Sequence, residues 1–188
     1  MLAYTREKLL DKLQLTPAIL DLYQQQNPSF ASEVLSWLSS VEEVMSRLRL
    51  SQASQITVEK GKVLAVMAGI PDQSFAVHRL SQRKLVQASA LFSLGRAQEA
   101  VQQKIQNIDQ QFEIWREKMA QYLAIATSRV PIPLPPSEPR EAWLKSVWSL
   151  LNINGETQNM YRYLNTALQP ADRNYLLSQL LDNLLQDL

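Results

Sequence analysis

Cysteine is absent from this 188-residue chain, and histidine and glycine are scarce, with one His and four Gly. Without Cys the chain cannot form a disulfide, a thiolate metal site or a cysteine nucleophile. One histidine, His78, is too few for the paired Glu-x-x-His ligands of di-iron bundles or for two-histidine zinc sites. No two Gly lie close enough to form a phosphate-binding loop. We therefore expect no cofactor, no metal and no enzymatic activity.

A surplus of charge of either sign and long apolar runs are also missing. The 19 Lys and Arg residues nearly balance the 18 Asp and Glu residues, so the chain as a whole has no strong attraction for nucleic acid or an anionic membrane. No stretch of 18 apolar residues occurs, and the first residues lack the apolar core of a signal peptide. These features predict a protein without a membrane span and with a cytoplasmic location.

The residues that are present predict an all-α fold, because apolar side chains recur at steps of three and four. The longest such pattern runs from Leu91 to Ala126 and spans about 54 Å if it forms one helix at 1.5 Å per residue. We call this segment the spine. Gly95 allows either one continuous helix or two helices that meet there. A homodimeric coiled coil is an alternative to a bundle, supported by Lys104 and Asp109 at facing g and e positions.

A second pattern of this kind, from Phe30 to Leu48, is the expected packing partner of the spine. We predict that the two helices pack antiparallel, with Trp37 interdigitating with Phe112 or Trp115. The segment 54–67 is compatible with a helix or a β-hairpin, and we favour the helix because no third strand is available to stabilise a hairpin.

Proline residues divide the chain near residue 130. We expect a helical bundle over residues 1–129, a proline-rich linker over 130–136 and a three-helix segment over 137–188. The last helix of that segment carries a stripe of leucines that is wide for one flanking helix to cover. We predict that this stripe binds a protein partner or a second copy of the chain, and the alternative is that it closes internally against Trp143, Val147, Leu164 and Leu168. Its members are Leu177, Leu181, Leu184 and Leu188.

The most basic local segment lies between Gln73 and Gln98, which contains no acidic residue. Arg79, Arg83 and Lys84 in this segment are candidates for contact with an anion or nucleic acid. The segment 9–26 also has the cadence of a helix-turn-helix, although two ordinary bundle helices explain the same pattern.

The function that follows from these patterns is a non-enzymatic helical protein–protein interaction module, such as an adaptor, assembly factor or complex subunit. The partner is a protein or a second copy of the chain, bound through helical surfaces. The alternative is a nucleic-acid-binding regulator that uses the basic helix face or the N-terminal helix pair, although the balanced charge makes nucleic acid the less favoured partner.

Overall fold

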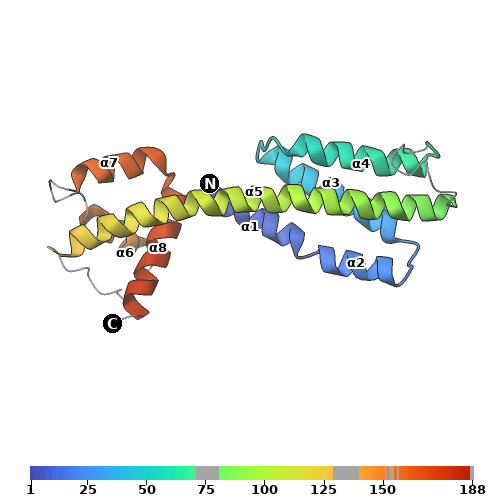
Figure 1. Ribbon diagram of the computed structural model, residues 1–188. Coiled ribbons are helices and arrows are strands. Elements are labelled where there is room, and N and C mark those ends of the chain that lie inside the picture. Colours follow the sequence, from blue (N-terminus) through green and yellow to red (C-terminus); the bar gives the residue numbers. More distant parts are fainter. Residues whose placement is uncertain (71–80, 129–139, 151, 153–154, 156, 187–188) are drawn as a thin grey trace. The chain divides into compact units, whose positions relative to one another are not determined.

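A computed structural model describes residues 1–70, 81–128, 140–150, 152, 155 and 157–186, and these residues form eight helices and no strand (Figure 1). The fold is therefore all-α, as the sequence predicts. His78, Arg79, the linker 130–136 and Leu188 lie outside the described residues. In chain order the helices are α1 (Leu2–Leu13), α2 (Thr16–Gln24), α3 (Phe30–Arg47), α4 (Ala53–Met67), α5 (Gln82–Thr127), α6 (Arg140–Leu150), α7 (Gln158–Ala167) and α8 (Pro170–Gln186).

The chain divides into two compact units. The first unit is Tyr4–Asn107, and the second unit consists of Met1–Ala3 and Ile108–Leu188. Helix α5 contributes residues to both units. It passes through Gly95 without a break, which resolves the choice between one helix and two in favour of one.

In the first unit, α3, α4 and α5 alternate in direction along the chain (Figure 1). The Gln82 side chain donates a hydrogen bond to the Val66 carbonyl oxygen at the start of α5, and Ser93 donates one to Glu59 further along, so α4 and α5 are antiparallel. Helix α4 also runs opposite to α3, to which it is joined by a short turn. The segment 54–67 is thus helical, as favoured above.

The predicted antiparallel pairing of α3 with the spine is wrong, because two reversals of the chain make these helices parallel. The predicted contact of Trp37 with Phe112 or Trp115 is also wrong. Trp37 lies in the core of the first unit, whereas Phe112 is in the core of the second unit, with Trp115 packed against that second core. The physical reason is length. At 1.5 Å per residue the 46-residue α5 spans about 69 Å and the 18-residue α3 about 27 Å, so α3 can cover only part of α5.

The core of the first unit takes side chains from all five helices that contribute to it. Its α5 side is built from small and aliphatic residues, which allow the neighbouring helices to approach closely. This composition follows from the stepwise apolar pattern of each helix. Its fully covered members include Leu9, Phe30, Val34, Leu38, Val41, Met45, Ile56, Val63, Ala90, Leu94, Ala97 and Val101.

The core of the second unit is richer in aromatic residues. Trp148 lies at its centre, with its ring centroid 6.0 Å from Tyr122 and 5.3 Å from Tyr161. The Arg173 guanidinium lies 4.9 Å from the Trp148 ring centroid, and the indole N–H donates to the Asn165 side chain. The remaining core residues include Ile108, Phe112, Met119, Leu123, Trp143, Leu144, Val147, Leu164, Leu168, Leu176, Leu177 and Leu181.

The N-terminus of α1 is capped by a residue that is remote in sequence. The backbone N–H groups of Leu2 and Ala3 donate to the Asp172 carboxylate at 2.8 and 2.9 Å, and the Met1 amino group forms an ion pair with it at 2.6 Å. Asp172 is 2% exposed and lies in the first turn of α8. The carboxylate thus satisfies donors that have no partner within α1.

Candidate functional site

The C-terminal leucine stripe is divided between core and surface. Leu177 and Leu181 are buried at 0% and 1% exposure, in the same core as Trp143, Val147, Leu164 and Leu168. These two leucines follow the alternative named above, in which the stripe closes internally. Leu184 is 45% exposed, so the partner-binding role of the stripe stays a prediction that rests on Leu184.

Two of the three predicted anion-contact residues share a cleft. Arg83 and Lys84, at the start of α5, line a cavity of about 590 Å³ with Tyr23, Gln24 and Gln26 at the end of α2. The Arg83 guanidinium donates to the Gln26 carbonyl oxygen at 3.1 Å. This hydrogen bond connects the end of α2 to the start of α5. Arg83 therefore stabilises the packing of these two helices, whether or not it also contacts a ligand.

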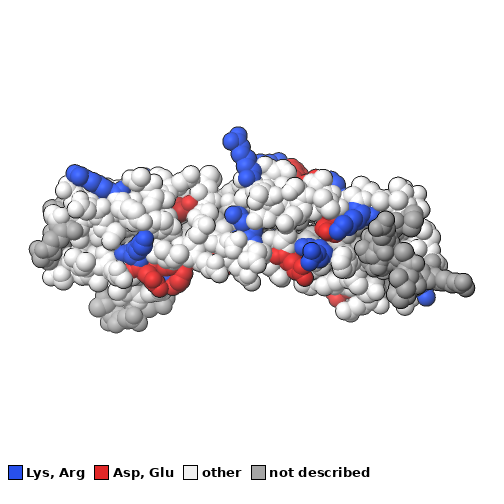
Figure 2. All heavy atoms as spheres, turned by 45° about the horizontal axis from the view of Figure 1, so that its top comes forward, with Lys and Arg blue, Asp and Glu red and all other residues white. Residues whose placement is uncertain are grey.

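The surface charge is otherwise distributed in small groups. On the face shown in Figure 2, the blue Lys and Arg side chains are scattered, and several lie beside red Asp or Glu side chains. Lys62 pairs with Glu59 at 2.7 Å, and Arg96 pairs with Glu99 at 3.3 Å. Paired charges of this kind do not form a continuous phosphate-binding surface.

The most ligand-like apolar feature is a groove between α2 and α3, which we call the α2–α3 groove. It lies entirely within the first unit, has a volume of about 520 Å³ and is lined mainly by apolar side chains. Its floor is formed by Ile19 and Trp37, which are nearly covered, and Leu15 stands at its edge with 52% of its surface exposed. The complete lining is Lys12, Leu15, Ala18, Ile19, Leu22, Glu33, Ser36, Trp37 and Ser40.

Local sequence explains why the groove has this form. Pro17 at the first turn of α2 ends the preceding helix and begins a new one, so Leu15 stands at the junction. At the other end of α2, Gln26 adopts a positive φ of 54° and the chain reverses into α3. The N-cap of α3 is Ser29, whose hydroxyl donates to the Asn27 side chain and makes no hydrogen bond to the helix.

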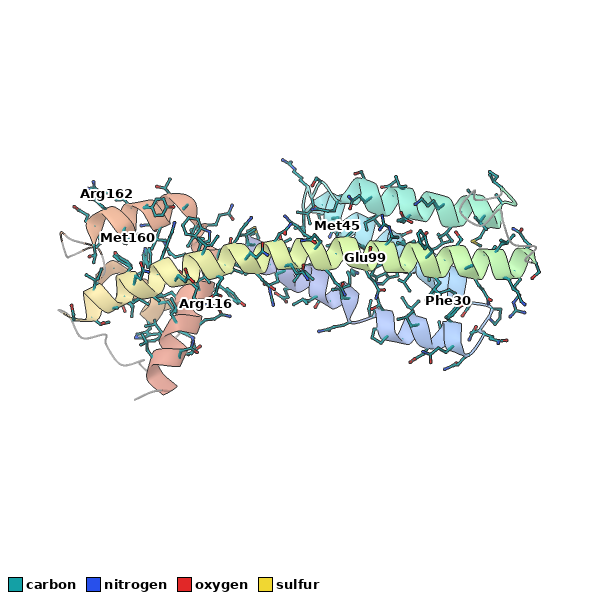
Figure 3. The ribbon with its side chains drawn as sticks, viewed as in Figure 1. Phe30, Met45, Glu99, Arg116, Met160 and Arg162 are labelled. Carbon is teal, nitrogen blue, oxygen red and sulfur yellow. The ribbon has the colours of Figure 1, made fainter. Side chains whose placement is uncertain are left out.

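Two contacts establish which ends of the helices face each other. The Trp37 indole N–H donates to the Lys12 carbonyl oxygen at 2.8 Å, and the rings of Tyr23 and Phe30 lie 5.1 Å apart. Phe30 is labelled in Figure 3, at the beginning of α3. The start of α2 therefore lies beside the middle of α3, and its end lies beside the beginning of α3. Lys12 is accordingly at one end of the groove and Glu33 at the other.

A smaller cavity of about 390 Å³ lies between α4 and α5 in the same unit. Its wall includes Glu59, whose carboxylate accepts hydrogen bonds from buried Ser93 at 3.0 Å and from Lys62 at 2.7 Å. Because both carboxylate oxygens already have donors, this acid is occupied in holding the two helices together. The Glu59 carboxylate is therefore not a vacant charge for a ligand in this cavity.

The resolved pKa shifts arise at structural contacts. Hydrogen bonds from Lys60 and Thr57 hold the pKa of Glu42 below its usual value, and burial raises the pKa of Tyr122 to about 12. For Asp172, burial opposes ionisation, but hydrogen bonds from the Met1 amino group and the Leu2 and Ala3 N–H groups outweigh it and lower the pKa.

Sequence reasoning did not find the groove, although it predicted its two helices. The segment 9–26 forms the end of α1 and all of α2, and the available signal was the apolar series Leu15, Ala18 and Leu22 at spacings of three and four. That series is offset from buried Ile19, so it marks the edge of the apolar face and not its centre. Which edge stays uncovered depends on where α3 packs.

Comparisons with known proteins leave the groove without a precedent: no family model, no curated protein and no solved structure matches this chain. Over the described parts of the chain, none of the helices has the length and apolar character needed to cross a membrane. In those same residues, His, Asp and Glu side chains do not gather in a group of three that could hold a metal ion.

Proposed function

We propose that this protein is a non-enzymatic helical interaction module that binds a protein partner in the α2–α3 groove. The observation that carries the proposal is the groove itself, an apolar depression of about 520 Å³ with Leu15 half exposed at its edge. Burying a leucine side chain completely stabilises by about 1.5–3 kcal/mol, so a partner that covers Leu15 gains roughly half of that amount from this residue.

The chemistry of the lining supports binding and not catalysis. The Ser40 hydroxyl donates to the Trp37 carbonyl oxygen of its own helix at 2.8 Å, and the lining contains no histidine or paired carboxylates to act as general base. What remains is an apolar floor with one charge at each end. Partner grooves with an apolar centre and a polar rim have this composition.

A selection of peptides tests the proposal directly. A displayed library of random 16-residue peptides is panned against the wild-type protein, and enriched peptides are measured against two variants. Ala18→Arg places a long cation in the groove at an exposed position, and Leu64→Arg places the same side chain on the exposed surface of α4 as a matched control. We expect binding to be lost in Ala18→Arg and kept in Leu64→Arg.

Three results would overturn the proposal. The first is that no peptide is enriched. The second is that Ala18→Arg binds the enriched peptides as well as wild type while its circular dichroism melt is unchanged. The third is self-association: if light scattering finds the wild type dimeric and Ala18→Arg monomeric, the groove is an interface between copies of this chain.

A nucleic-acid-binding regulator is the second candidate, and the shared cleft of Arg83 and Lys84 favours it. The cleft contains two cationic side chains. This number is small for duplex binding, because the affinity for DNA grows with the number of phosphates that Lys and Arg side chains neutralise. We therefore rank this function below partner binding.

A further inference from the structure

The geometry points to one kind of occupant for the α2–α3 groove: an amphipathic helix of a partner protein, about two turns in contact, lying with its N-terminal end at Glu33 and its C-terminal end at Lys12. This inference rests on the proposed function and adds to it the secondary structure, direction and charge pattern of the partner.

The length of the groove matches a helical contact. Its α2 wall runs from Leu15 to Leu22, which is eight residues and, at 1.5 Å for each of the seven steps between them, about 10 Å of helix. Side chains at positions i, i+3, i+4 and i+7 of a docked helix cover the same distance on one face. The apolar floor of Ile19 and Trp37 lies beneath that span.

The backbone of the groove excludes an extended peptide that pairs by main-chain hydrogen bonds. Both walls are helices, α2 and α3, whose N–H and C=O groups in the middle of each helix are bonded within it. A strand laid in the groove would leave its own N–H and C=O groups without partners, which is costly in an apolar site. A helix satisfies these groups internally.

The side chains at the rim allow a helix to approach closely. Ala18 on α2 and Ser36 and Ser40 on α3 are all small, and small side chains at a contact favour the shorter end of the usual 8–10 Å range of distances between helix axes. Leu15 then stands beside the docked helix and contributes the apolar area that it now exposes.

The direction follows from the two charges. Lys12 and Glu33 lie at opposite ends of the groove, and within the described residues neither has an ion-pair partner. A helix carries partial positive charge at its N-terminus and partial negative charge at its C-terminus. It therefore binds favourably with its N-terminus at Glu33 and its C-terminus at Lys12, with a basic residue in its first turn and an acidic residue in its last.

Two designed peptide sets test the inference. Both sets have leucines at i, i+3, i+4 and i+7 and a lactam bridge on the outward face that holds them helical. The matched set has Lys in the first turn and Glu in the last turn, and the reversed set exchanges these charges. Affinities for wild type, Ala18→Arg and the double variant Lys12→Glu with Glu33→Lys are measured by fluorescence anisotropy.

We expect wild type to bind the matched set about five- to tenfold more tightly than the reversed set, and the double variant to prefer the reversed set. Equal affinity for both sets, or an unchanged preference in the double variant, overturns the direction and leaves the proposed function standing. If the selected random peptides bind the groove and neither helical set does, the helical occupant is wrong. If Ala18→Arg binds every peptide as well as wild type does, the proposed function fails as well.

Discussion

The hydroxyl of Ser93 on α5 donates a 3.0 Å hydrogen bond to the carboxylate of Glu59 on α4, and both residues are buried. One turn earlier on α5, Ser89 is equally buried, but its hydroxyl has no hydrogen-bond partner among the residues that the structure describes. The same helix thus presents the same residue type in two states, one with its polar group satisfied and one without.

This pair makes a matched stability test. Ser93→Ala removes a hydrogen bond to a charged group and should lower the free energy of unfolding by about 1.5–3 kcal/mol. Ser89→Ala removes a hydroxyl whose burial is uncompensated, so it should leave stability unchanged or raise it by about 1 kcal/mol. Urea denaturation of both variants checks the difference, and equal destabilisation would show that the Ser93 bond is not stabilising.

The cap that Asp172 provides to α1 predicts a pH dependence. Its pKa is lowered in the folded protein below the ordinary value of 3.8, so the carboxylate stabilises the fold at pH values above 3.8. That contribution is lost as the pH falls through the lower folded pKa. Asp172→Asn should destabilise the protein by about 1–3 kcal/mol at pH 7, and the gap to wild type should narrow progressively as the pH falls below 3.8.

Thermal melts between pH 3 and pH 7 measure this gap. The control is Asp11→Asn, which removes a carboxylate from a surface pair with Lys8 in which Asp11 is 51% exposed, and such pairs contribute little. A gap between Asp172→Asn and wild type that stays constant over the whole pH range would contradict a stabilising charge at Asp172.

Alanine substitutions of the α8 leucines should lower the free energy of unfolding by amounts that depend on how deeply each leucine is buried. Leu177→Ala removes a fully covered side chain and should cost about 2–5 kcal/mol. Leu184→Ala changes a side chain that is 45% exposed and should stay within about 0.5 kcal/mol. Chemical denaturation reports both values, and a mild effect at Leu177 would place the stripe outside the core.

At physiological salt, this protein should bind duplex DNA no more tightly than a neutral control protein of similar size does. The reason is that Arg83 and Lys84 supply two cations, whereas useful affinity needs several neutralised phosphates. Anisotropy titrations with a labelled duplex check this expectation. Submicromolar binding that weakens steeply with salt and disappears in the double variant Arg83→Glu with Lys84→Glu would instead support the nucleic-acid function.

The sequence predicts the residues of the two cores better than it predicts the groove. The apolar steps of three and four predict the helices and many of their buried positions, including Val34, Trp37 and Val41 on α3. They do so because a helix of fixed pitch must place such residues on one face. The preference for helix over hairpin at 54–67 had a different basis, the lack of a third strand to stabilise a hairpin, and is confirmed by α4.

By itself, then, the sequence determined an all-α chain, the positions of most helices and the side of each helix that is apolar. The tertiary structure alone decided that α3 and α5 run parallel, that Leu177 is covered while Leu184 is exposed, and that Asp172 caps Leu2 from 170 residues away. It also decided that α2 and α3 leave a groove between them. The physical reason is that helical periodicity is local and records which face of a helix is apolar, whereas the helix that covers this face is selected by packing between residues far apart in the chain.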